Sequence, residues 1–223
     1  MPLLISLGTI IVYSRFDIMK TKLILFISLL SASFTHAQTV LVSPKDSIRI
    51  LNDKRIKINT TGMEVLGAWG IANIAEGGIG YLSAKQDTWK AFHEMNAIWG
   101  VINTGIAVAG FSGARRELEK KYNTNQSYDR YKATKKLFLI NAGLDVVYMG
   151  IGAGLYEYSQ SKSNKNPAVY DGFGKSFVLQ GVFLLLFDNT MFALHNRSNS
   201  RWLQAMQEIQ FTGKGIGFVH TFK

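Results

Sequence analysis

The amino-acid sequence predicts an all-α fold: a membrane-embedded four-helix bundle after a signal peptide, with a short C-terminal β-strand or hairpin. Three observations predict it. Four apolar segments of helical length follow one another along the chain. Small and amide side chains recur within them at spacings of three and four residues. A run with the layout of a secretory signal precedes them.

The targeting segment begins at Met19. A basic stretch, Met19 to Lys22, is followed by an apolar run over 23–30 and by a small-residue region that ends at Ala37. This order predicts a signal peptide cleaved after Ala37, and an uncleaved membrane anchor is the alternative. The predicted organisation is an upstream extension plus signal over 1–37 (signal 19–37), a polar segment over 38–60, a four-helix membrane domain over 61–196, and a C-terminal surface segment with a strand-like end over 197–223.

The four apolar segments are expected at 61–84, 95–114, 137–158 and 177–195. The segment 95–114 contains no charged residue and is about the length that crosses ~30 Å of hydrocarbon. The segment 61–84, which is glycine-rich and carries Glu76, is the weakest span. The polar segment 38–60 alternates weakly in hydropathy, so both short strands and an amphipathic approach to the first helix are open.

Each segment has one face of small and polar residues, which we call the polar seam. In lipid, glycine and alanine allow helix backbones to approach closely, and amide side chains hydrogen-bond between helices. The pattern is the inverse of a water-soluble amphipathic helix. The seam consists of Gly70, Asn73, Gly77 and Gly80 in the first segment; Asn96, Gly100, Asn103, Ala107 and Gly110 in the second; Asn141, Asp145, Tyr148 and Gly152 in the third; and Gly181, Leu184, Asp188, Met191 and His195 in the fourth.

Two stretches, 58–73 and 94–103, carry a family resemblance. The second contains Met-Asn-x-x-Trp-Gly-x-x-Asn, from Met95 to Asn103. The chain resembles an uncharacterised family of exported four-helix membrane proteins of Bacteroidota, classed as a domain of unknown function. The resemblance implies a signal peptide followed by a small helical membrane domain, and it supplies no catalytic residues. The stretches 68–73 and 98–103 are also similar to each other. The similarity reflects either an internal duplication or the independent occurrence of Trp, Gly and Asn in two packing helices.

Polar and ionisable residues within the apolar segments are the candidate functional residues, because such groups are costly in lipid. Asp145, Asp188 and His195 are weak candidates for a metal or proton site, although no short metal-ligand motif supports them. In the alternative interpretation, the same side chains only hydrogen-bond the helices together. The candidates are Asn73, Glu76, Asn96, Asn103, Asn141, Asp145, Asp188 and His195.

The composition excludes several classes of site. The chain has no cysteine, which rules out disulfides, thiolate chemistry and cysteine-based zinc sites. We find no nucleophile elbow, P-loop or dinucleotide-binding motif and expect no cofactor. The net charge of +10 favours anionic surfaces such as lipid headgroups. The expected partner is the lipid bilayer, with self-association or an envelope protein as further possibilities, and no nucleic acid.

Three functions remain open from the sequence. The first is a structural or accessory membrane protein of the bacterial envelope, in the inner rather than the outer membrane. The second is a small transport or ion-pathway component lined by Asn, Asp and Glu. The third is a membrane-embedded metal-dependent enzyme, although the sequence leans against enzymatic activity. Four spans after an exported N-terminus would place the basic hairpin 115–136 outside the cytoplasm, which conflicts with the positive-inside rule.

Overall fold

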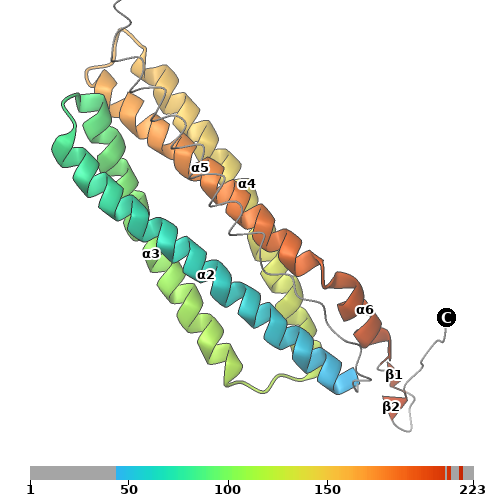
Figure 1. Ribbon diagram of the computed structural model, residues 1–223. Helices are drawn as coiled ribbons and strands as arrows, with labels where there is room; N and C mark the ends of the chain where they lie inside the picture. The colour runs from blue at the N-terminus through green and yellow to red at the C-terminus, as the bar shows by residue number, and fades with distance from the viewer. Residues whose placement is uncertain (1–43, 209, 212–215, 218–223) are drawn as a thin grey trace, which may run out of the picture. The chain divides into compact units, whose positions relative to one another are not determined.

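The structure, a computed structural model, describes residues 44–208, 210–211 and 216–217 of the chain. In this part, four long helices form a bundle (Figure 1): α2 (Pro44–Ser83), α3 (Asp87–Leu118), α4 (Thr124–Ser159) and α5 (Pro167–Asn196). A shorter helix, α6 (Asn199–Glu208), follows. The prediction of an all-α fold with four long helices is confirmed. The predicted extension and signal peptide over 1–37 lie outside the described residues.

Helix α2 is longer than the sequence suggested. It begins at Pro44 and continues without a break through residue 60, so of the two alternatives left open for this stretch, the short strands are excluded for residues 44–60. Pro44 suits a helix start because the first turn leaves its backbone N–H groups unpaired in any case. Buried residues recur here at spacings of three and four, which places them on one helical side: Ile48, Leu51, Asn52, Arg55 and Ile56. The weak alternation in hydropathy therefore came from one face of a helix, which continues across residues 60 and 61.

The bundle is built from two antiparallel hairpins. Helix α2 packs along α3 and α4 packs along α5, while contacts between α3 and α5 join the two hairpins. Glycine allows the closest approaches. A Cβ atom built on Gly100 would lie 2.6 Å from the Gly70 carbonyl oxygen, and one built on Gly152 would lie 2.7 Å from the Gly174 carbonyl oxygen. The small residues of the polar seam therefore set the distance between helices.

The C-terminal part covers one end of the bundle. Helix α6 contacts α2, and its Trp202 is 1% exposed. The Trp202 ring stacks on Tyr131 at a centroid distance of 5.0 Å, and both rings join a buried cluster with Ile48 and Leu51. Strands β1 (Gln210–Phe211) and β2 (Ile216–Gly217) form a minimal antiparallel pair. Beyond this two-residue pairing, the short C-terminal β-strand or hairpin that the sequence predicts is not supported.

The outer surface of the bundle is apolar over three helical stretches. Asp87–Leu118, Thr124–Ser159 and Pro167–Gln207 are long and apolar enough to cross a membrane, and α2 is not among the spans found in the described residues. The segment 61–84, which the sequence analysis ranked as the weakest span, lies in α2 and is therefore the one not found among the candidate membrane spans. Large apolar side chains nevertheless face outward on α2 as well, among them Ile79 and Leu82. The apolar outer face is therefore shared by all four long helices.

The start of α4 carries a reciprocal cap that provides a stability prediction. The Asn123 side chain accepts a hydrogen bond from the Gln126 backbone N–H at 2.9 Å, and the Gln126 side chain accepts one from the Asn123 N–H at 3.0 Å. We expect Asn123→Ala to lower the free energy of unfolding by about 1 kcal/mol, because the Gln126 backbone N–H loses its side-chain acceptor. Thermal unfolding in detergent measures this. Thr124→Ala, one residue later, is the control, and an equal loss in both variants would contradict the cap.

Candidate functional site

Gln180 is the centre of a buried hydrogen-bond network between α2, α3 and α5. Its side chain is fully buried. Its Oε1 accepts hydrogen bonds from Trp69 Nε1 at 2.9 Å and from Asn103 Nδ2 at 3.3 Å. Its Nε2 donates to Asn73 Oδ1 at 2.7 Å and to Asn96 Oδ1 at 3.2 Å. One amide thus joins four side chains from two other helices, and we call this arrangement the Gln180 network.

The network extends toward the end of the bundle where α2 turns into α3. Asn96 Oδ1 also accepts a hydrogen bond from Ser176 Oγ at 2.6 Å, and its Nδ2 donates to Glu76 Oε2 at 3.4 Å. Glu76 Oε1 lies 2.7 Å from His93 Nδ1. The Glu76 side chain is 50% exposed, so it closes the network at the surface rather than inside the bundle.

The two similar stretches of sequence occupy matching positions in this arrangement. Gly70 of the first and Gly100 of the second lie at the α2–α3 contact, each against the carbonyl oxygen of the other. A Cβ atom built on Gly70 would lie 2.8 Å from the Gly100 carbonyl oxygen, just as one built on Gly100 would lie 2.6 Å from the Gly70 carbonyl oxygen. Asn73 and Asn103 then reach the same side chain, Gln180, from their two helices. In the repeated Gly-x-x-Asn pattern, the two glycines therefore form one close contact between α2 and α3, and the two asparagines both hydrogen-bond to Gln180.

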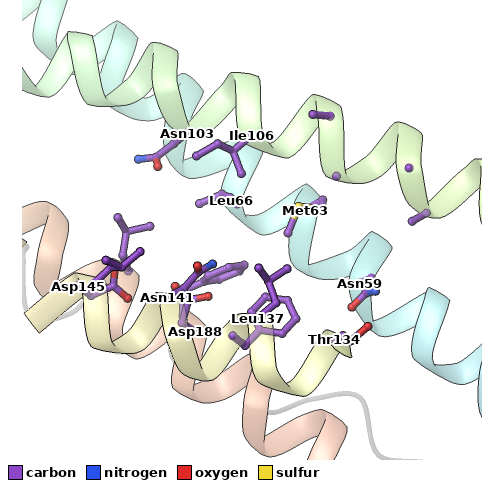
Figure 2. A pocket seen from close by; sticks show the side chains of 18 of the residues that line it. Asn59, Met63, Leu66, Asn103, Ile106, Thr134, Leu137, Asn141, Asp145 and Asp188 are labelled. Atoms are coloured by element: carbon purple, nitrogen blue, oxygen red, sulfur yellow. The ribbon is translucent and has the colours of Figure 1, made fainter. Parts of the chain in front are cut away.

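A crevice of about 650 Å³ lies between the two hairpins beyond the Gln180 network, and we call it the α3–α4 crevice. All four long helices line it. Figure 2 shows Asn103 and Ile106 of α3 on one side and Asn141 and Asp145 of α4 on the other, with Asp188 close to Asn141. Helix α3 packs against α2 and α5 and makes few contacts with α4. The space between α3 and α4 therefore stays open on one side. Apolar side chains such as Leu137 line the opening.

Asp145 and Asp188 are the ionisable groups buried at this crevice. They are 2% and 4% exposed, and their carboxyl groups lie within hydrogen-bonding reach of each other. Asp145 Oδ2 and Asp188 Oδ1 have no hydrogen-bond partner among the described residues. The described part of the chain also contains no ion pair with either carboxylate. Trp99 Nε1, at the same crevice, is likewise without a partner there.

His195 belongs to a different site, two helical turns away from Asp188. Its Nε2 lies 2.9 Å from Asn59 Oδ1, and its ring stacks on Phe138 at a centroid distance of 5.6 Å. Within the residues that the structure describes, no group of three His, Asp or Glu side chains is placed to hold a metal ion. Asp145, Asp188 and His195 therefore do not form one set of ligands.

A charged cluster lies at the other end of the crevice. Arg55 is 3% exposed and forms an ion pair with Glu117, whose other oxygen lies 3.0 Å from Arg130 Nη1. Arg55 also donates two hydrogen bonds to Asn52 Oδ1, at 3.0 and 3.2 Å. Its positive charge is thus fully engaged by α2 and α3. The cluster ties the start of α2 to the end of α3, and the counter-charge of Arg55 in it is Glu117 rather than a buried aspartate.

Several residues of these networks were not among the candidates from sequence: Ser176, Gln180, Trp69, Arg55 and Asn59. A signal for two of them existed. Counting back by fours from Leu184 in the fourth segment gives Gln180 and then Ser176, on the same helical face. Arg55 and Asn59 fell in the segment that was not assigned to a helix. Of the predicted candidates, Asn73, Asn96, Asn103, Asp145, Asp188 and His195 are buried, Asn141 is partly buried and Glu76 is exposed.

Comparison with known proteins gives a family and no activity. No curated protein and no solved structure matches the chain. A family model described as "Family of unknown function (DUF6992)" matches residues 65–189, more than half of the chain. The matched region contains the Gln180 network and both buried carboxylates, whereas Arg55, Asn59 and His195 lie outside it. The chain therefore belongs to the DUF6992 family, a family of unknown function.

Proposed function

We propose that this chain is an exported integral membrane protein of the bacterial envelope, with a structural or accessory role rather than an enzymatic one. The observation that carries the proposal is the inverted distribution of polarity. Leu82, Ile79 and Leu186 are 87%, 71% and 65% exposed, while Gln180 and Asn103 are buried. Apolar side chains outside and amides inside suit a hydrocarbon surround, in which polar groups must find partners within the protein.

The Gln180 network supports a structural role for most of the polar seam. Its side chains hydrogen-bond to one another across three helices. In lipid, each such bond contributes roughly 0.6–2 kcal/mol to helix association. The seam therefore serves to hold the two hairpins together. The helical character of the spans favours the inner membrane, where helical proteins insert.

Membrane fractionation tests the proposal. We expect the full chain, expressed with its N-terminal region, to sediment with membranes and to resist extraction at alkaline pH, because α3, α4 and α5 each present enough apolar length to span. N-terminal sequencing of the mature protein then reports whether cleavage follows Ala37. A folded monomer in detergent-free buffer would contradict membrane insertion, and an uncleaved N-terminus would contradict only the export signal.

The absence of cysteine from the chain makes a topology measurement clean. A cysteine introduced as Lys121→Cys, at the basic connection between α3 and α4, is labelled from outside intact cells only if this connection faces away from the cytoplasm. Four spans after an exported N-terminus predict labelling. Protection from the reagent would show that one helix does not cross, and α2 is the helix that lacks a span of sufficient apolar character among those described. Lys162→Cys, in the connection between α4 and α5, is expected to give the opposite result.

A further inference from the structure

The α3–α4 crevice has the dimensions and lining of a ligand site that the structural role does not use. About 650 Å³ lies within the range of small-molecule pockets. Its lining is mostly apolar and includes the aromatic rings of Trp99, Phe138, Tyr148 and Phe187. Trp99 and Tyr148 meet edge to face at a centroid distance of 5.1 Å. Such rings attract a cation placed within about 6 Å of a ring centre.

The charge at the crevice also selects for a cation. Two carboxyl groups close together and away from water repel each other strongly when both are ionised, so a positive charge placed beside them would stabilise the pair. Among the described residues, no Lys or Arg forms an ion pair with Asp145 or Asp188, and Arg55 is engaged by Glu117. A buried carboxylate without a counter-charge is costly in an apolar surround. One oxygen of each carboxyl group has no partner.

We propose that the α3–α4 crevice binds a hydrophobic organic monocation, with its positive charge held at Asp145 and Asp188 and its apolar groups against the aromatic lining. The cation supplies the counter-charge that the helices lack. The apolar groups of the cation take the place of lipid hydrocarbon chains at the open side of the crevice. A small hydrated metal ion fits less well, because no third acidic or imidazole ligand joins the two carboxylates in the described part of the chain.

Two probes of the same shape and opposite charge test this binding. We expect the full chain in uncharged detergent micelles to bind tetraphenylphosphonium at least about tenfold more tightly than tetraphenylborate, by isothermal titration calorimetry. The net charge of +10 would by itself favour the anion, so nonspecific attraction cannot produce this preference. Equal binding of the two probes, or no binding of the cation, would overturn the proposal, and the latter would indicate that the pair holds only a proton.

Matched variants assign the binding to the crevice. Asp145→Asn and Asp188→Asn are each expected to remove the preference for the cation. Asp171→Asn, on α5 but away from the crevice and paired with Lys175, should retain it. A preference that survives in both crevice variants would refute the site.

A second pair of variants leaves both carboxylates in place, in case the asparagine variants do not fold. Ala109 lines the crevice, and Ala109→Phe is expected to block the cation. Val108 is the neighbouring residue, is 62% exposed and does not line the crevice, so Val108→Phe should bind the cation normally. Equal cation binding by these two variants would overturn the proposal. The measurement is made in detergent, so it stands or falls separately from membrane insertion and export.

Discussion

Gly100→Ala is expected to lower the free energy of unfolding by about 2–3 kcal/mol, although alanine is the better helix former. The new methyl group would lie 2.6 Å from Gly70 O and 2.7 Å from Ile74 N. Both are backbone atoms, which cannot rotate away as a side chain can. The α2–α3 contact must therefore separate by a substantial part of a methyl diameter, and the hydrogen bonds of Asn73 and Asn103 to Gln180 would lengthen with it.

Gly105→Ala on the same helix is the matched control. Apart from the nearby backbone of its own helix, no heavy atom of the described residues lies within 4 Å of a Cβ built on Gly105, so this variant should keep its stability or gain up to about 1 kcal/mol from helix propensity. Unfolding of both variants in the same detergent, followed by circular dichroism, measures the difference. If both glycines tolerate alanine equally, close packing of α2 on α3 through Gly100 is not what holds this hairpin together.

Gln180→Leu is the second variant with a large expected effect, a loss of about 3 kcal/mol. Leucine is close to glutamine in size, so packing changes little. Four side-chain hydrogen bonds, to Trp69, Asn73, Asn96 and Asn103, disappear together. Each hydrogen bond contributes on average about 0.6 kcal/mol in a membrane protein. The four side chains that bonded to Gln180 also lose a partner in a buried region, where water does not replace it.

The same substitution at Asn189 separates this network effect from the general cost of replacing an amide. Asn189 lies on α5 but is exposed, and its Nδ2 donates only to the Leu185 carbonyl of its own helix. Asn189→Leu is expected to change stability little. A double variant, Gln180→Leu with Asn103→Leu, should lose less than the sum of the two single losses, because both residues serve one network. Strict additivity would argue that the amides act separately.

The residue pattern alone determined the helices and their inward faces. Spacings of three and four define a helical face whatever that face contacts, and for this reason Asn96, Asn103, Asp145 and Asp188 could be placed on the inner side from the sequence. The same rule failed before residue 61, where the helix is mostly polar outside the buried Ile48, Leu51 and Ile56 and its periodicity is weak. Arg55 and Asn59 were missed for that reason.

Only the tertiary structure decided which of these inward residues meet. Periodicity fixes the direction of a side chain about its own axis, but the partner across the interface depends on how two helices are staggered and how far apart they lie. Glycine brings α2 against α3 and α3 against α5, so the amides there close on Gln180. Helices α3 and α4 have no comparable contact. Asp145 and Asp188 therefore line a crevice, while His195, on the same face of α5, pairs with Asn59 instead.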